Sequence, residues 1–269
     1  MSDVPEHRGR KVESEIYIKA PVQKVWEAWV NPEHIAGWFV HFARDRAEAG
    51  GSVTWGFEGF GEFAQDVLVA DRNERLVLQA FPGALLEITL EREGGSTKIT
   101  LVQSGFADGA EWDEPMAGVG SGWDLALGLL KQYVEHHFGE KKHTFFVARP
   151  SAVPPIEARE WLTDVQLLSR WFTVSGAPAR VGEPFELRLH HGAVLCGTTI
   201  ARSAREVSFA LDTNDIVPDL KTFAGSVMGP GPSMVGIRGT SWSVDTAVFK
   251  ELEAYCASAI ERLSKELSA

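Results

Sequence analysis

Aromatic side chains are the residues of this sequence whose type and spacing favour ligand binding. Trp55 and Phe57 alternate along one predicted strand, and Trp123 stands on a predicted amphipathic helix. Such rings either fill the core of a domain or line a pocket for an apolar small molecule, since ligand pockets are mostly apolar with a few polar groups. Both interpretations stay open from the residues alone. The nine candidate ligand-binding residues are Trp38, Phe39, Trp55, Phe57, Phe63, Phe81, Phe106, Trp112 and Trp123.

Residues suited to metal binding or covalent catalysis are not spaced for either task. His136 and His137 are adjacent on a predicted helix, so their side chains diverge by about 100° and cannot share one ion. Ser121 lies in a GxGSG pattern, whereas a nucleophile elbow needs GxSxG between a strand and a helix. Cys196 and Cys256 are predicted to be small core residues. We therefore predict no metal, no cofactor and no catalytic residue.

The elements that would position the rings follow from the hydrophobic period and from prolines. Alternation over 12–19 predicts a strand, Pro21 and Asn31-Pro32 bracket a short helix, and a second short helix ends at Trp38. Turn residues such as DRNE, PG and EGGS separate the strands that come next. Those predicted strands are residues 52–58, 61–70, 75–81, 84–92 and 97–106.

A long amphipathic helix is predicted over residues 116–138. Its apolar side chains recur at helical spacing, and Gly139 follows as a helix stop. An antiparallel meander followed by one long helix predicts a helix-grip α+β fold, in which a curved sheet wraps the helix. That arrangement often leaves a cavity between sheet and helix.

An internal repeat indicates two copies of this domain. APVQKVWEAWVNPEHIAGWFV from Ala20 is echoed by VPPIEAREWLTDVQLLSRWFTV from Val153, and both segments end in Trp-Phe motifs. GGSVTWGF from Gly50 is echoed by GEPFELRL from Gly182. We therefore predict domains at 1–141 and 142–269, the second one divergent over 213–241 and lacking counterparts of the SGF and GW motifs of the first.

Five segments of the first copy carry a family resemblance. They are IYIKAPVQKVWEAWVNPEHIAGWF, GGSVTWGF, GEFAQDVLVADRNERLVLQAF, TKITLVQSGFADGAEW and GSGWDLALGLLKQYVEH, in this order across residues 12–137. They resemble bacterial proteins related to the activator of the heat-shock-protein-90 ATPase, within the START-like or SRPBCC superfamily. The resemblance implies a helix-grip fold, and it implies members that bind ligands as well as a co-chaperone.

Three functions of different classes follow from these observations. The favoured one is non-catalytic binding of a small apolar or amphipathic ligand in the cavity of the first domain. The alternatives are a chaperone- or stress-related protein-interaction module and a cyclase- or hydrolase-type enzyme that uses the same cavity. A buried, unpartnered carboxylate or histidine in the cavity would favour the enzyme.

Composition limits the other partners and the compartment. The 26 basic and 37 acidic residues give a net charge of −11, which argues against a nucleic-acid-binding surface. Neither a membrane-spanning run nor a secretory signal is predicted, and two cysteines do not build a disulfide framework. We therefore expect a cytoplasmic protein with no nucleic-acid or membrane partner.

Overall fold

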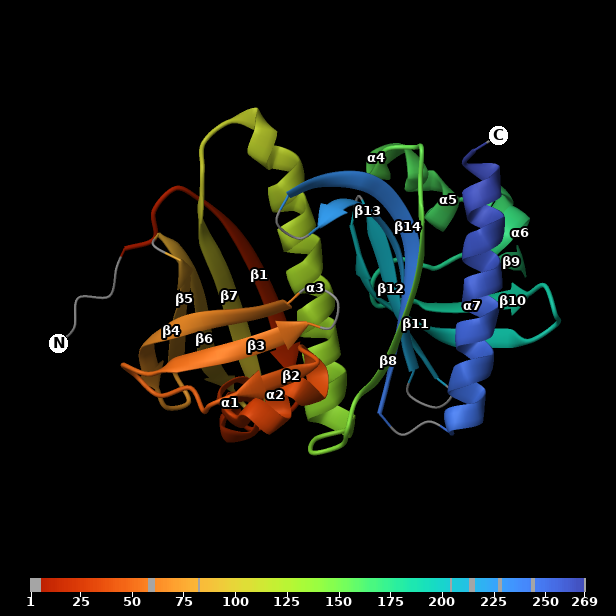
Figure 1. Cartoon of the computed structure of the whole chain (residues 1–269). Coiled ribbons are helices and arrows are strands. Elements are labelled where there is room, and N and C mark those ends of the chain that lie inside the picture. The colour runs from red at the N-terminus through yellow and green to blue at the C-terminus, as the bar shows by residue number, and fades with distance from the viewer. Residues whose placement is uncertain are drawn as a thin grey trace. The chain divides into compact units, whose positions relative to one another are not determined.

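The chain forms two compact units, Met1–Lys141 and Lys142–Ala269, named unit 1 and unit 2 below. This computed structural model describes residues 6–57, 61–81, 83–203, 205–212, 216–226, 229–242 and 245–268. Figure 1 shows in each unit a curved sheet with one long helix lying against it. Each unit is described by itself.

Unit 1 is a seven-stranded antiparallel sheet with the order β1-β7-β6-β5-β4-β3-β2, closed by the helix α3. Neighbouring strands of the meander pair in sequence, and the first strand adds beside the last one. The elements are β1 Arg10–Ile18, α1 Val22–Val30, α2 Pro32–Trp38, β2 Phe42–Arg44, β3 Ser52–Phe57, β4 Gly61–Asp71, β5 Arg75–Phe81, β6 Ala84–Glu93, β7 Ser96–Phe106, the 3-10 turn η1 Ala110–Trp112, and α3 Asp113–His136.

The two short helices begin and end where the sequence dictates. Pro21 precedes α1, and Asn31 accepts a hydrogen bond from the backbone N–H of Glu33 at the start of α2. Because Pro32 has no N–H, the carbonyl of Ala28 cannot bond to it within a continuing helix. The indole Nε1 of Trp38 donates to that carbonyl instead, at 2.9 Å.

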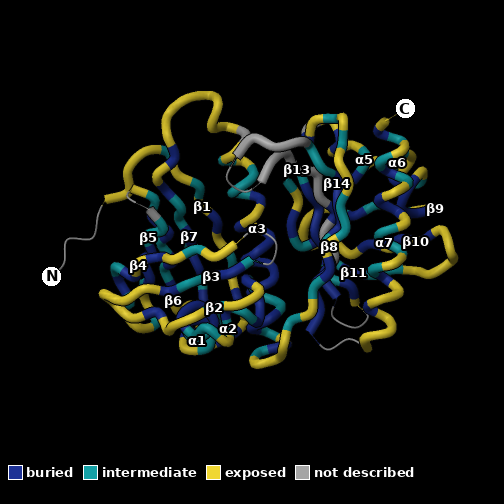
Figure 2. The backbone as a smooth tube through the Cα atoms, in the orientation of Figure 1, coloured by how far each residue is buried: buried dark blue, intermediate teal, exposed yellow. Residues whose placement is uncertain are grey.

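Unit 2 repeats this plan with the strand order β8-β14-β13-β12-β11-β10-β9, again antiparallel throughout its described pairs. In β10, buried Phe185, Leu187 and Leu189 alternate with exposed residues (Figure 2). The elements are β8 His143–Pro150, α4 Pro155–Ala158, α5 Glu160–Thr163, α6 Val165–Trp171, β9 Thr173–Ser175, β10 Pro184–Leu189, β11 Val194–Arg202, β12 Glu206–Leu211, β13 Ile216–Ser226, β14 Gly229–Ser241 and α7 Thr246–Glu266.

Equivalent details recur in the two units at a nearly constant spacing along the chain. Trp171 Nε1 donates to the carbonyl of Trp161 at 2.8 Å, as Trp38 donates to Ala28. Both sheets carry an irregularity at matching places, between Val67 and Val69 and between Thr199 and Ala201. The prediction of two tandem helix-grip domains is thereby confirmed.

Four details differ from the sequence-based expectations. The strand β2 was not predicted, because three residues are too few for a periodic signal. The helix α3 runs from Asp113 to His136 instead of over 116–138, and the hydroxyl of Ser121 within it donates to the carbonyl of Ala117. The divergent segment 213–241 contains the hairpin β13–β14, although residues 213–215, 227 and 228 lie outside the described part. The sequence predicts no counterpart of Trp123 in unit 2, whereas the structure places the ring of Tyr255 against Phe172, as described below.

Candidate functional site

Six of the nine predicted rings form one connected cluster in unit 1, centred on Phe39. This residue follows the last turn of α2, and its ring meets rings from α2, β3 and α3. The distances between ring centroids are 5.1 Å to Trp38, 5.5 Å to Trp55, 5.4 Å to Phe57 and 5.3 Å to Trp123. Phe63 of β4 joins through Phe57 at 6.1 Å. We call these six residues together with Trp29 the ring cluster.

The ring cluster has a buried side and an accessible side. Trp38, Trp55 and Trp123 are buried, whereas Phe39, Phe57 and Phe63 are only half-buried. In the β3–β4 pair Trp55 lies opposite Phe63, and Trp123 of α3 stacks on Phe39. Part of the aromatic surface is therefore accessible to solvent beside buried tryptophans.

Two indole N–H groups give the ring cluster its polar character. Trp123 Nε1 donates to Oε1 of Gln103 on β7 at 2.6 Å. Trp29 Nε1 is buried and has no hydrogen-bond partner among the described residues. A buried donor without an acceptor is costly, by about 1–3 kcal/mol.

Trp29 was not among the sequence-based candidates, although it belongs to the cluster. Its ring lies 4.8 Å from Trp38, edge to face, and 6.5 Å from Trp123. The available signal was its spacing of three residues from Trp26 on α1, which places both tryptophans on one side of the helix. Gln103 was also missed, because its partner Trp123 comes from another element.

Of the remaining three predicted rings, two have no described contact with the cluster. Phe106 and Trp112 form a pair of their own, with ring centroids 6.3 Å apart, and Trp112 is 37% exposed. The side chain of Phe81 lies outside the described residues.

The corresponding rings of unit 2 are Trp171, Phe172 and Tyr255. The ring of Tyr255 lies 5.9 Å from Phe172, the counterpart of Phe39, so Tyr255 takes the part that Trp123 has in unit 1. The Tyr255 hydroxyl donates to the carbonyl of Phe172 and accepts from the N–H of His190. These two hydrogen bonds join α7 to the segments after α6 and β10 and occupy the polar atoms at this end of unit 2.

Two surface pockets of unit 1 lie away from the ring cluster. One has a volume of about 360 Å³ and is lined by residues that include Trp26, Arg46, Ala47, Glu48, Ala70 and Arg72. The other, of about 230 Å³, lies beside Pro21, Val22 and Ser96. None of the nine predicted site residues lines either pocket.

Half-buried His34 and buried Tyr133 form a polar pair at the other end of α2. Tyr133 Oη lies 2.9 Å from His34 Nδ1 and accepts from the N–H of Gly139 at 3.0 Å. Burial raises the pKa of Tyr133 and lowers the pKa of His34. A Cβ on Gly37 would lie 2.7 Å from the Tyr133 hydroxyl, so a glycine is needed for this approach. The pair therefore links α2 to α3 through a side-chain hydrogen bond.

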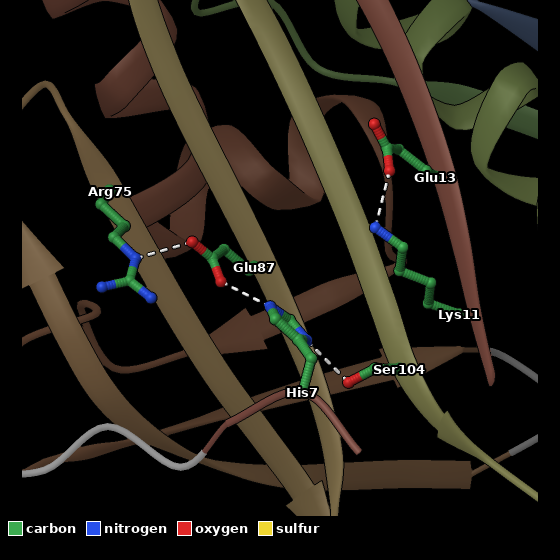
Figure 3. A network of polar contacts seen from close by, with 6 residues as sticks. All are labelled: His7, Lys11, Glu13, Arg75, Glu87 and Ser104. Carbon is green, nitrogen blue, oxygen red and sulfur yellow. Dashed lines mark hydrogen bonds and ion pairs between the residues drawn. The ribbon is translucent and has the colours of Figure 1, made fainter. Parts of the chain in front are cut away.

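His7, Ser104 and Glu87 form a serine–histidine–carboxylate chain on the sheet (Figure 3). His7 Nδ1 lies 2.8 Å from Ser104 Oγ, its Nε2 lies 2.6 Å from Glu87 Oε2, and Arg75 Nε donates to Glu87 Oε1 at 2.7 Å. The hydroxyl is not available to a substrate, because Ser104 is 2% exposed. The chain therefore holds the N-terminal segment on β6 and β7.

Replacement of Glu87 by glutamine should remove a pH-dependent part of the stability. Burial raises the pKa of this carboxyl, but the hydrogen bonds from Arg75 and His7 outweigh it and the net pKa is lowered. The carboxylate therefore stabilises the fold above the ordinary pKa of about 4.3, and this contribution is lost as the pH falls through the lowered value. Urea unfolding from about pH 7 to pH 3 measures this effect. The difference in free energy of unfolding between wild type and Glu87→Gln should become smaller as the pH falls.

The matched control is Glu62→Gln, which breaks the exposed bidentate pair with Arg44. Exposed ion pairs contribute only about 0–1 kcal/mol, so Glu62→Gln should lower the free energy of unfolding less than Glu87→Gln does at neutral pH. A gap for Glu87→Gln that stays constant with pH would contradict this assignment.

Other classes of site find no support in the described part of the chain. No group of three or more His, Cys, Asp or Glu side chains there could hold a metal ion. Burial raises the pKa of the Cys256 thiol to about 12, so this cysteine is unreactive at neutral pH. Of the described helices, none has the length and apolarity needed to cross a membrane.

Residues 19–135 match the sequence model of the family described as Activator of Hsp90 ATPase homolog 1-like protein. The matched range extends from the end of β1 to the last turn of α3 and includes the ring cluster. The match covers most of unit 1 and no residue of unit 2. The curated proteins contain no match to the chain.

Solved structures similar to the chain fall into two groups by coverage. Protein BH1534 from Bacillus halodurans is 27% identical over 48% of this chain and all of its own (100%), with a TM-score of 0.43. The Aha1 dimer from Colwellia psychrerythraea is 20% identical over 48% of this chain and 99% of that one, with a TM-score of 0.44. DynU16, a protein in the dynemicin biosynthetic locus, is 16% identical over 98% of this chain and 100% of its own, with a TM-score of 0.42.

Proposed function

We propose that unit 1 binds a small apolar or amphipathic molecule against the ring cluster and releases it chemically unchanged. The observation that carries this proposal is the half-buried face of Phe39, Phe57 and Phe63 above the buried tryptophans. A flat apolar ligand that covers this face would bury aromatic surface and stack on rings that are already held in place. Few rotamers need to be ordered, which keeps the entropic cost of binding low.

The ligand also needs one hydrogen-bond acceptor. Trp29 Nε1 is a buried donor without a partner in the described part of unit 1, so a carbonyl or ether oxygen that reached it would remove a desolvation cost. The indole and amide groups at the ring cluster do not titrate near neutral pH, which favours binding over acid–base catalysis.

Unit 2 serves this function poorly. We infer that it is a divergent START-like domain, with the boundary at residues 141 and 142, and that Tyr255 closes the end where the ligand of unit 1 would lie. The expected compartment is the cytoplasm. A role as a protein-interaction module, for example with a chaperone, is the outcome favoured if no ligand is found.

The test is titration of the full chain with flavone and with dodecanoate, followed by calorimetry and by tryptophan fluorescence. Phe39→Leu keeps an apolar side chain at a half-buried position but removes the central ring, and we expect binding to weaken by about tenfold. Trp123→Ala should abolish the fluorescence response in a protein that is still folded.

The matched control is Trp112→Leu. Trp112 is an exposed ring of the same unit that touches only Phe106 among the described rings, so its loss should leave affinity unchanged. An equal loss in Trp112→Leu and Phe39→Leu would contradict the proposal, as would the absence of saturable binding by either ligand.

A further inference from the structure

The pocket beside α1 combines an apolar floor with two guanidinium groups. The apolar part of its lining is buried Trp26 with the alanines at positions 47, 49 and 70, and the charged part is Arg46, Glu48 and Arg72. Its volume of about 360 Å³ falls within the range of small-molecule sites, about 300–1,000 Å³. No residue of the ring cluster lines it, so the pocket is separate from the site proposed above.

Backbone hydrogen bonds hold the loop that lines this pocket. Ala47 is buried and its N–H donates to the carbonyl of Val30 at 3.0 Å, which ties the loop after β2 to α1. Gly50, in a left-handed conformation with φ +80°, donates to the carbonyl of Val67 at 2.8 Å. A ligand would therefore meet a preformed site and would not need to order the loop.

The two arginines differ in what holds them. Arg46 makes a bidentate pair with Glu27, with N···O distances of 2.9 and 2.7 Å. These hydrogen bonds lower the pKa of Glu27 and raise that of Arg46, so both groups stay ionised. Their opposite charges cancel. Arg72 is exposed at the β4–β5 turn and makes neither a hydrogen bond nor an ion pair with any residue that the structure describes. The Arg72 guanidinium is thus exposed at this pocket, with Glu27 close enough to feel its charge and Glu48 in the same lining.

Unit 2 shows that the fold does not require these side chains. At the spacing that relates Trp38 to Trp171, the position of Trp26 is taken by Arg159 and that of Arg46 by Ala179. The second copy builds the same sheet without the indole floor and without the locked arginine. Packing alone therefore does not explain why unit 1 has them.

We propose that this pocket binds a small carboxylic acid with an aromatic or aliphatic body. The body would lie on Trp26 and the alanines, and the carboxylate would bond to the free guanidinium of Arg72, whose planar fork matches two carboxylate oxygens. Glu48 at the same pocket disfavours ligands of higher negative charge, and a single carboxylate is the anion that suits the site.

Nuclear magnetic resonance of the full chain tests this with 2-naphthoate as the probe and 2-naphthalenemethanol as its uncharged match. We expect 2-naphthoate to shift the amide signals of Ala47 and Ala70 and the indole signal of Trp26 in a saturable way. The alcohol should bind this pocket about tenfold more weakly, because it lacks the charge-assisted bonds. Arg72→Gln should lower the affinity for 2-naphthoate by about the same factor, so that the variant binds the acid and the alcohol equally well.

The control is Arg44→Gln, which removes an exposed arginine at the start of the same loop that pairs with Glu62 and does not line the pocket. It should leave 2-naphthoate binding unchanged. The proposal is overturned if the alcohol binds this pocket as well as the acid, or if Arg72→Gln has no effect. Shifts confined to Phe39 and its neighbours would overturn it too, while supporting the ring-cluster site, so the two proposals fail separately.

Discussion

Trp38→Ala should lower the free energy of unfolding of unit 1 by about 3–5 kcal/mol, the range for loss of a large buried aromatic residue. The indole is completely buried and packs edge to face on Trp29 at 4.8 Å. Its Nε1 also supplies the hydrogen bond that Pro32 cannot give to the carbonyl of Ala28. The substitution therefore leaves both a cavity and an unsatisfied helix terminus.

The experiment is chemical denaturation of the full chain, with hydrogen exchange by mass spectrometry to locate the loss. Trp171→Ala provides the matched test, since Trp171 is buried in the same way and bonds to the carbonyl of Trp161. Each variant should lose exchange protection mainly in its own unit. An exposed control, Trp112→Ala, should stay within about 0.5 kcal/mol of wild type. A loss below about 1 kcal/mol in Trp38→Ala would contradict the assigned packing.

Leu130→Ala should cost about 2–5 kcal/mol, as large-to-small changes in a packed core do. Leu130 is fully buried on α3, on the side that carries Trp123, Leu127 and Val134, all of them buried. Leu130 lies on the face of α3 that packs against the sheet. Alanine at this position would leave the volume of the leucine side chain empty.

Thermal and urea unfolding measure this loss. His136→Ala, at an exposed position near the end of the same helix, controls for changes in helix propensity and should have little effect. A cost well below 1 kcal/mol for Leu130→Ala would mean that the sheet does not grip α3 at this point.

The prediction of strands and helices succeeded where a local rule applied. The period of two in β3 and the helical period in α3 reflect one-sided burial, and Pro21, Pro32 and Gly139 mark boundaries because they restrict or free the backbone. The repeat could be recognised because the tryptophan of the Trp-Phe motif makes the same indole hydrogen bond to a preceding helix in both copies. The three-residue strand β2 was invisible because its only signal is its pairing with β3.

The sequence by itself therefore determined the elements, their order, the duplication and the kind of residue available for a site. Only the tertiary structure decided which rings meet. Register between β3 and β4, and the packing of α2 and α3, bring Phe39 onto Trp123 and leave Trp112 outside. The same holds for the hydrogen bonds that link His7 to Ser104 and Glu87 and for the ion pair of Arg46 with Glu27, because each joins residues of different elements. Such distances are set by the fold as a whole, and no periodicity along the chain encodes them.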